Sequence, residues 1–302
     1  MGKQGALAKG RAGKNGTIRA YTREYLDLHW GRRMSILFSL PYLVACRLTL
    51  STRRWNNQLL VLPDQSTEDR LEEYLESFTV SKEHHLLKIG KGRRVSVVVN
   101  DDGKKVLKLY IPKKGLTGLL HALFPSKAFV ECCMALRLFS LGIPVPYPFV
   151  VIERRWFPGC GKSILVLKYL EGCEVVSKVF PSLKGENRTT FLEGLARFAK
   201  RLHSTCFCHS DLWARNILVS QDQKSFFIID LDGGFFNCRL LPFRAPVNLA
   251  QLLFSLNKAS NLTAEEVELF LRSYGATRRA LARTIKAYNR KFGLWPWREE
   301  IY

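Results

Sequence analysis

The sequence predicts an α+β protein with two lobes, a small antiparallel β-rich lobe followed by a helical lobe. Strand patterns are concentrated between about residues 85 and 170, whereas everything beyond about residue 245 is helical in pattern. A turn-rich connector near residue 170 separates the two regions. We therefore expect a basic N-terminal extension with a short apolar segment over residues 1–80, a first lobe over 81–170 and a second lobe over 171–302.

Composition is ordinary for a globular protein, but the charge is not. The chain has 302 residues, of which 47% are apolar, and this excludes disorder, collagen-like repeats or coiled coil for the whole chain. Lys and Arg number 47 against 26 Asp and Glu, for a net charge of +21. Such a charge favours anionic partners, namely nucleic acid, acidic lipid headgroups or phosphorylated substrates. No basic segment interleaved with aromatic residues is present, so nucleic acid is not expected.

The spacing of the cysteines and the length of the apolar runs indicate the cellular compartment of the protein. The eight cysteines include no C-x-x-C pair, and we expect buried, reduced thiols in a cytosolic protein. The longest apolar run, Met34 to Cys46, is shorter than the roughly 18 residues of a membrane-spanning helix. Its end, Leu43-Val44-Ala45-Cys46, resembles a lipoprotein cleavage site. The segment before the apolar run is too long for the basic n-region of a signal peptide. We therefore favour a core or interfacial segment over a lipoprotein signal.

The elements of the first lobe follow from turn and cap signals. β-branched runs at residues 93–100 and 105–111 flank Asp101-Asp102-Gly103, which predicts a hairpin. Ser126 is placed to cap a helix that Gly142 ends. Residues 163–170 follow as a buried strand.

The elements of the second lobe begin with a helix. Residues 191–203 have the apolar spacing of an amphipathic helix. Two short strands at 217–220 and 225–230 come next, joined by a polar turn. The remaining residues beyond 245 are expected to be helical.

One segment of the second lobe combines three oxygen ligands. Asp211 and Asn216 lie five residues apart, and an apolar strand then ends at Asp230, with Asp232 two residues on. Phosphoryl transfer needs one carboxylate to receive or orient the acceptor hydroxyl, and an amide and a second carboxylate to hold Mg²⁺ against the phosphates. The spacing beginning at His209, H-x-D-x(4)-N followed by D-x-x, is that of the protein-kinase-like fold.

The first lobe carries a matching lysine. Lys108 lies within a strand pattern, and Glu131 is the sole acidic residue of the following helix, so we expect the two to pair on the phosphates of ATP. The alternative is that Lys108 points outward from a half-buried strand. Gly90 and Gly92 could cover the phosphates with backbone N–H groups, although any hairpin would look similar. The segment ending at Glu171 is expected to be the hinge whose backbone binds adenine.

Over about residues 85–275 the chain resembles the lipopolysaccharide kinase family, the Kdo/heptose kinases that phosphorylate inner-core sugars with ATP. The resemblance is carried by the following segments: VLKLYIPKKG, LGIPVP, LVLKYLEG, HSDLWARNILV, FFIIDLDGG and VNLAQLLFSLNK. It implies a bilobal protein-kinase-like fold that uses ATP and Mg²⁺, with these roles: Asp211 as catalytic base, Lys108 and Glu131 on ATP, His209 orienting the loop, Asn216 and Asp230 on the metal, and Asp232 as a second carboxylate.

Two features depart from the kinase pattern. The second residue after Asp211 is Trp213, where protein kinases have a lysine, and Arg215 is a candidate substitute. The full six-residue glycine motif is absent, and residues 1–80 match no part of the family pattern.

The expected substrate is a lipid-linked anionic sugar, because the family acts on a lipid-anchored core. This implies a phosphotransferase with an alcohol acceptor, placed in the cytoplasm and peripheral to the inner face of the inner membrane. Residues 112–125 have one apolar face with two lysines. They would either pack on the small lobe or enter the headgroup region of an acidic bilayer, assisted by the eleven basic residues among the first 60.

Two other functions remain open from the sequence. The same fold could phosphorylate a protein or a small soluble hydroxyl compound. A non-catalytic basic module is the third possibility, and the intact set of Lys108, Asp211, Asn216 and Asp230 argues against it.

Overall fold

A computed structural model of the chain describes residues 51–55, 58–62, 84–90, 92–100, 103–111, 125–156 and 159–297. The chain divides into two compact units, Met1–Thr49 and Leu50–Tyr302, and every described residue belongs to the second. The core or interfacial segment expected at residues 34–46 lies outside the described residues, as does the segment expected at 112–125 except for its last residue.

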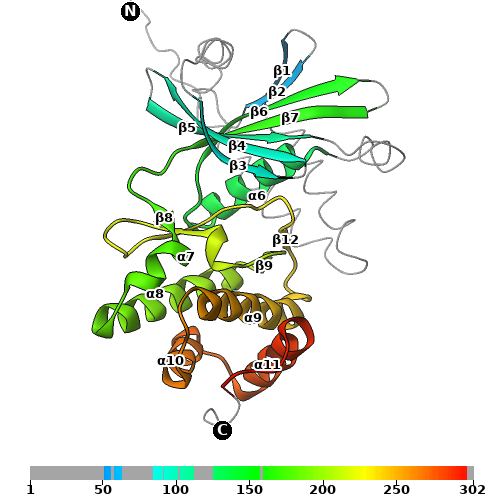
Figure 1. Cartoon of the computed structure of the whole chain (residues 1–302). Helices are drawn as coiled ribbons and strands as arrows, with labels where there is room; N and C mark the ends of the chain where they lie inside the picture. Colours follow the sequence, from blue (N-terminus) through cyan, green and yellow to red (C-terminus); the bar gives the residue numbers. More distant parts are fainter. Residues whose placement is uncertain are drawn as a thin grey trace, which may run out of the picture. The chain divides into compact units, whose positions relative to one another are not determined.

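The first lobe is built on an antiparallel sheet whose strand order is β1-β2-β6-β7-β5-β4-β3 (Figure 1). Its strands are β1 (Ser51–Trp55), β2 (Gln58–Leu62), β3 (His84–Gly90), β4 (Arg93–Asn100), β5 (Gly103–Tyr110), β6 (Pro148–Trp156) and β7 (Gly159–Lys168). The predicted hairpin is present as β4 and β5, with Asn100 opposite Gly103 at the turn. Gly103 has a φ of +97°, which glycine adopts without strain.

The first two strands correct the expected boundary of the first lobe. Residues 51–62 were assigned to the N-terminal extension, but β2 pairs with β6 and extends the sheet. Each of these strands has five residues, too few for an alternating pattern to stand out from the basic segment around it.

Helix α6 (Lys127–Ser140) packs on the sheet, as the capping signals predicted. The Ser126 hydroxyl accepts a hydrogen bond from the Phe129 N–H at 3.1 Å, which fixes the first turn. The helix ends at Ser140 with Leu141 as its C-cap, and Gly142 follows with a φ of +75°. One face of α6 is fully buried, and Glu131 lies on that face.

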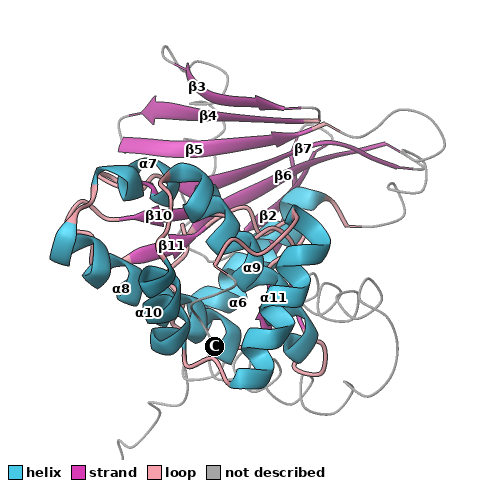
Figure 2. Cartoon of the chain, turned by 60° about the horizontal axis from the view of Figure 1, so that its bottom comes forward, coloured by secondary structure: helices cyan, strands magenta, loops and turns pink. Residues whose placement is uncertain are grey.

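The second lobe is mainly helical (Figure 2). Its helices are α7 (Val176–Val179), α8 (Gly185–Ser204), α9 (Leu241–Ala259), α10 (Ala264–Tyr274) and α11 (Arg278–Phe292), with 3₁₀ turns η1 (Phe180–Ser182) and η2 (Ala214–Asn216). Its short strands are β8 (Glu174–Val175), β9 (Phe207–Cys208), β10 (Ile217–Val219), β11 (Phe226–Ile228) and β12 (Phe235–Phe236). They pair as β11-β10-β8 and β12-β9, so the chain enters and leaves residues 209–216 through paired strands.

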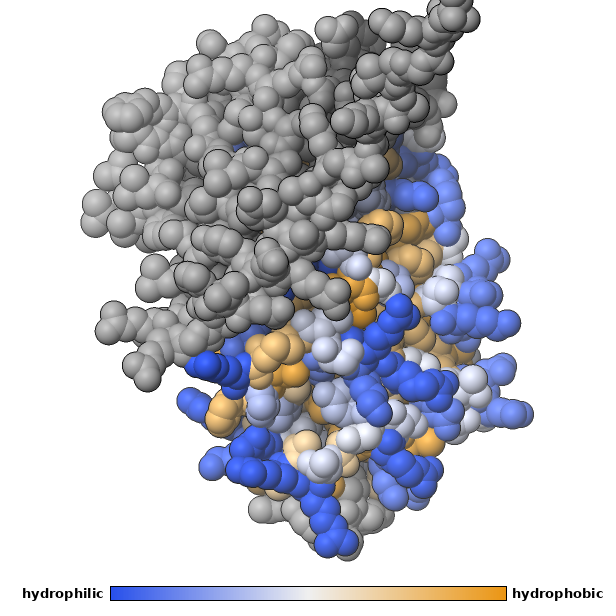
Figure 3. Space-filling model, turned by 180° about the vertical axis from the view of Figure 1, so that it is seen from behind, coloured by the Kyte–Doolittle hydropathy of each residue, from blue (hydrophilic) through white to orange (hydrophobic). Residues whose placement is uncertain are grey.

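Aromatic side chains form much of the core of this lobe. The Phe191 ring meets the ring of Phe226 edge-on, at 5.2 Å between centroids, which joins α8 to β11. Between α9 and α11, Phe254 stacks on Phe292 at 4.1 Å between ring centroids, and Tyr288 contacts both rings. On the face drawn in Figure 3, hydrophilic side chains cover much of the described surface and apolar side chains form smaller patches.

A disulfide between Cys206 and Cys238 corrects the expectation that all cysteines are reduced. The two residues lie 32 positions apart and flank the β9·β12 pair, where the Asn237 N–H also donates to the Cys206 carbonyl oxygen at 2.8 Å. Sequence spacing gave no sign of this bond because long-range strand pairing creates it. Cys132 and Cys133 are buried, Cys208 is a buried free thiol, and Cys173 is a half-buried one.

None of the helices in the described parts of the chain combines the length and the apolar character needed to cross a bilayer.

Candidate active site

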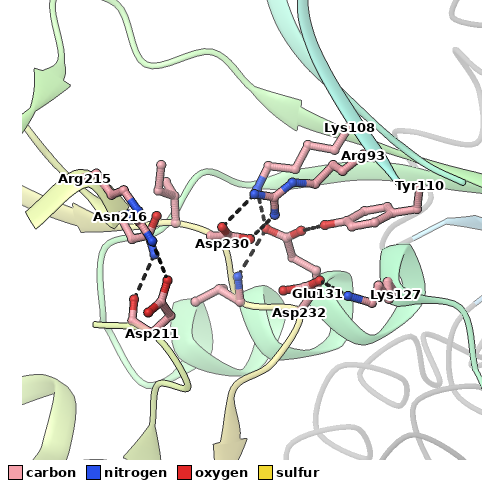
Figure 4. Close-up of polar contacts among 12 residues, drawn as sticks. Arg93, Lys108, Tyr110, Lys127, Glu131, Asp211, Arg215, Asn216, Asp230 and Asp232 are labelled. Atoms are coloured by element: carbon pink, nitrogen blue, oxygen red, sulfur yellow. Dashed lines mark hydrogen bonds and ion pairs between the residues drawn. The ribbon is translucent and has the colours of Figure 1, made fainter. Parts of the chain in front are cut away.

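Lys108 and Glu131 form a buried ion pair between β5 and α6. The Lys108 Nζ lies 2.5 Å from a Glu131 Oε1, and the two residues are 6% and 2% exposed (Figure 4). The predicted contact is therefore present, and the alternative of an outward-pointing lysine is excluded. The pair is inside because α6 packs its buried face on the sheet and Lys108 is one of the buried residues of β5.

Two further groups hold the Glu131 carboxylate. The Tyr110 hydroxyl donates to its second oxygen, and the Leu231 N–H donates to Oε1 at 3.3 Å. Burial and the nearby Glu131 charge raise the pKa of Tyr110 well above its usual value, so the phenol keeps its proton. Glu131 thus ties the small lobe to the segment that follows Asp230.

Asp230 follows β11 with a left-handed φ of 66°. Its carboxylate accepts two hydrogen bonds from the Arg93 guanidinium, one of them at 2.8 Å from Nη2 to Oδ2. Burial would raise the pKa of Asp230, but the Arg93 hydrogen bonds and the Lys108 charge outweigh burial and lower the pKa to about 2. Asp230 is therefore an anion at neutral pH.

Asp211 and Asn216 lie together in the loop between β9 and β10. The Asn216 Nδ2 donates to the Asp211 carbonyl oxygen at 2.8 Å, which orients the amide. Arg215 donates to the Asp211 Oδ2 at 2.9 Å, and its guanidinium lies 4.7 Å from the centre of the Trp213 ring. The Asp211 side chain is 40% exposed, so an incoming molecule can reach it.

His209 holds the same loop from inside. Its Nδ1 accepts from the Asp211 N–H at 3.0 Å, and its Nε2 lies 3.2 Å from the Ile229 carbonyl oxygen. Burial lowers the pKa of His209, so the ring is neutral and donates from Nε2. This arrangement fits the expectation that His209 orients the loop.

A polar face of α9 holds the backbone of this loop, and these contacts were not predicted from the sequence. Asn248 donates to the His209 carbonyl oxygen at 2.6 Å, Gln251 accepts from the Leu212 N–H at 3.3 Å, and Ser255 accepts from the Ala214 N–H at 2.9 Å. All three are buried. Their spacing of three and four residues places them on one face of an otherwise apolar helix. This spacing is the sequence feature from which a polar contact surface could have been predicted.

The remaining predicted residues lie around this centre. Gly90 and Gly92 are in the β3–β4 turn, where Gly92 has a φ of +85° and its carbonyl oxygen accepts from the Ile111 N–H at 2.9 Å. Glu171 is exposed after β7, and Lys104 contacts it at 3.4 Å. Asp232 pairs instead with Lys127 at the start of α6, at 2.9 Å.

The oxygen donors fit a magnesium ion held against phosphates. The described residues contain no cluster of three His, Cys, Asp or Glu side chains that would form a protein-only metal cage. Magnesium bound with nucleotide needs one or two protein oxygens, the others coming from phosphates and water. The ionised Asp230 carboxylate and the side-chain amide oxygen of Asn216 are of the kind that such an ion would need. The backbone N–H of Ile229 donates to the backbone carbonyl oxygen of Asn216 at 3.0 Å, which keeps the two segments adjacent.

A β-rich lobe carrying a buried Lys–Glu pair and a helical lobe carrying an Asp–Asn loop with a following Asp define a protein-kinase-like fold. A solved structure described as "WaaP in complex with acyl carrier protein" has this fold too. It aligns with a TM-score of 0.53 at 19% identity, covering 76% of this chain and 98% of that one.

The chain belongs to the lipopolysaccharide kinase (Kdo/WaaP) family, whose model matches residues 79–274. It is 30% identical over 155 residues to a 3-deoxy-D-manno-octulosonic acid kinase of Xylella fastidiosa strain 9a5c, covering 51% of this chain and 59% of that protein. It is 22% identical over 233 residues to the protein of the same name from Haemophilus influenzae strain 86-028NP, covering 69% and 96%. Membership of this family implies a phosphotransferase that uses ATP.

Proposed function

We propose that the chain transfers the terminal phosphoryl group of ATP to a hydroxyl group of Kdo in the lipopolysaccharide inner core. The observation that carries the proposal is the buried Lys108–Glu131 pair, bonded through Leu231 to the segment that presents Asp230. The names of the two curated relatives favour Kdo as the acceptor, and a heptose of the same core is the neighbouring possibility.

Residues of both lobes prepare the donor. Lys108, fixed in place by Glu131, binds phosphate oxygens of ATP. Asp230 and Asn216 hold a magnesium ion, which when bound neutralises charge on the phosphates. The turn containing Gly90 and Gly92 lies beside this centre, because Arg93 at its end reaches Asp230, and its backbone N–H groups cover the phosphates. The backbone before Glu171 binds adenine, and the exposed Glu171 side chain contacts Lys104 at 3.4 Å.

Asp211 handles the acceptor. Its half-exposed carboxylate orients the sugar hydroxyl and accepts its proton as the new phosphate ester forms. Arg215, bonded to Asp211, supplies positive charge where protein kinases have a lysine and this chain has Trp213. His209 takes no proton in the reaction; it is a positioning residue for the Asp211 backbone.

The acceptor determines where the enzyme works. A kinase for a lipid-anchored core sugar must meet an acidic bilayer surface, and the net charge of +21 supports peripheral contact with the inner face of the inner membrane. The use of Mg²⁺ and ATP and the location at the membrane are part of the same proposal as the Kdo acceptor.

The test is a panel of purified acceptors with ³¹P detection of the product. It contains Kdo-bearing lipid A, heptose-bearing core, a soluble sugar and a generic protein substrate, each with Mg·ATP. We expect a new phosphomonoester on Kdo-bearing lipid A. The Asp211→Asn variant should reduce transfer by about a hundredfold or more while still binding ATP.

Other results would change the assignment. Transfer to the heptose core alone would move the acceptor within the family, and equal turnover of a soluble acceptor without lipid would favour a different kinase. An Asp211→Asn variant with full activity would show that Asp211 is not the catalytic base. Absence of nucleotide binding by the wild-type protein would reject the proposed function as a whole.

A further inference from the structure

Arg93 was not among the predicted site residues, yet it contacts the central carboxylate of the site. It is the first residue of β4, directly after the Gly92 turn, and its guanidinium reaches Asp230 across the two lobes. Figure 4 shows it beside Lys108, directed toward Asp230. The Arg93 side chain is 22% exposed, so the contact is partly shielded from water.

This contact uses both oxygens of Asp230. One guanidinium nitrogen bonds Oδ1 and the other bonds Oδ2, which is the bidentate geometry of a strong arginine–carboxylate pair. A divalent cation on Asp230 would need at least one of these oxygens. Arg93 and a divalent cation therefore compete for the same carboxylate.

The backbone of Arg93 is fixed while its side chain is long. Arg93 is opposite Tyr110 in the β4–β5 ladder, and the neighbouring Gly92 carbonyl oxygen is bonded to the Ile111 N–H. The guanidinium can leave Asp230 by side-chain rotation alone and remain next to the glycine turn. That turn is the part of the small lobe assigned to the phosphates, and guanidinium groups bind phosphate oxygens well.

We propose that Arg93 exchanges partners during nucleotide loading: it neutralises Asp230 before loading and binds a phosphate oxygen of ATP afterwards. The exchange rests on the proposed function, because it assumes a divalent cation and a nucleotide at this site. It keeps the local charge balanced in both states, since Asp230 always has a cationic partner. It also makes Arg93 a phosphate-binding residue of the small lobe, in addition to Lys108.

The first measurement is binding of Mn²⁺ alone, by electron paramagnetic resonance, to protein without nucleotide. Arg93→Gln should bind Mn²⁺ about tenfold more tightly than the wild type, because the competing cation is gone. Arg94→Gln is the matched control: it removes the same charge from the adjacent, exposed position of β4 and should leave Mn²⁺ affinity unchanged. Asp230→Asn should weaken Mn²⁺ binding in every background.

The second measurement is calorimetric binding of a non-hydrolysable ATP analogue with Mg²⁺. Arg93→Gln should weaken this binding about tenfold, opposite in sign to its effect on Mn²⁺ alone, whereas Arg94→Gln should not. Circular dichroism melting identifies any misfolded variant. Arg93→Lys, which keeps the charge but loses the bidentate geometry, should give intermediate values for both ligands.

The outcomes separate the two proposals. If the wild type binds Mg·nucleotide and phosphorylates the sugar but Arg93→Gln changes neither affinity, the exchange is wrong and the proposed function stands. If Arg93→Gln and Arg94→Gln have equal effects, the cause is general charge and the exchange is again wrong. If the wild type binds no nucleotide, the proposed function fails first.

Discussion

Lys108 and Glu131 come from a strand and a helix 23 residues apart and meet as a nearly water-free ion pair, with 2.5 Å between the lysine nitrogen and a carboxylate oxygen. Because desolvating two charges is costly, such a pair adds little net stability, but each partner depends strongly on the other. This dependence gives the pair a measurable signature that an exposed pair lacks.

Replacing Lys108 with Met should lower the free energy of unfolding by about 3–5 kcal/mol, because it leaves the Glu131 charge buried with the Tyr110 hydroxyl and the Leu231 N–H as its remaining bonds. Urea unfolding measures the loss. Lys104→Met breaks the exposed contact to Glu171 and should cost less than about 1 kcal/mol. Equal losses in the two variants would contradict a buried pair, and a Lys108→Met/Glu131→Leu double variant should be more stable than Lys108→Met.

Asn248→Leu should damage catalysis more than nucleotide binding. The change removes the hydrogen bond to the His209 carbonyl oxygen while filling the same space, and it should cost about 1–3 kcal/mol of stability. Since Lys108 is on the other lobe, kcat should fall with little change in KM for ATP. Asn257→Leu is the control, because Asn257 is on the same helix but accepts from the Leu262 N–H at 2.9 Å. A parallel loss of kcat in both variants would make the role of Asn248 merely structural.

Stability should depend on pH through His203. Burial lowers the pKa of this residue from 6.5 to about 4, even though the hydrogen bond to Asn248 opposes the effect. The unfolded chain therefore binds a proton between pH 6.5 and 4 that the folded protein does not, so stability is complete above pH 6.5 and falls as pH falls through this window. The expected loss is at most about 3 kcal/mol.

Chemical unfolding from pH 7.5 to 4.5 checks this dependence, with His203→Gln as the comparison. The variant should show a shallower fall, and the remaining slope contains the contribution of His209, whose pKa is also lowered by burial. Identical slopes for variant and wild type would show that His203 does not contribute.

The Cys206–Cys238 bond should make thermal stability sensitive to reductant. Closing a loop of this length lowers the entropy of the unfolded chain by the equivalent of about 3–4 kcal/mol. Dithiothreitol should lower the melting temperature of the wild type but not of the Cys206→Ser/Cys238→Ser variant. Cys173→Ser, at a free thiol, should behave as the wild type. If the wild type melts at the same temperature with and without reductant, the bond contributes nothing to stability.

Local pattern was sufficient to predict part of the fold. The hairpin, α6 and the helical C-terminal region came from turn residues, caps and periodicity, which act over a few residues. Strands β1 and β2 were missed because strands of five residues have little periodicity of their own. The disulfide was missed because only the pairing of β9 with β12 brings Cys206 to Cys238.

Part of the candidate site was likewise predictable from the sequence, and part was not. The Lys108–Glu131 contact was predictable because one strand lysine and one helical acid were available, and the spacing of Asp211 and Asn216 indicated a shared loop. The contact of Arg93 with Asp230 was not predictable, because the two residues are 137 positions apart. From the sequence alone, an arginine at the end of a hairpin turn is expected to be exposed to solvent. The roles of these residues stay predictions until the substitutions above are measured.

The polar face of α9 has a consequence for how related chains are judged. The backbone of residues 209–214 is held by Asn248, Gln251 and Ser255, about forty positions downstream. A homologue could keep every letter of the loop and still lose turnover by drifting to apolar residues on that helix. Sorting active from inactive relatives thus requires reading the supporting helix together with the motif that it carries.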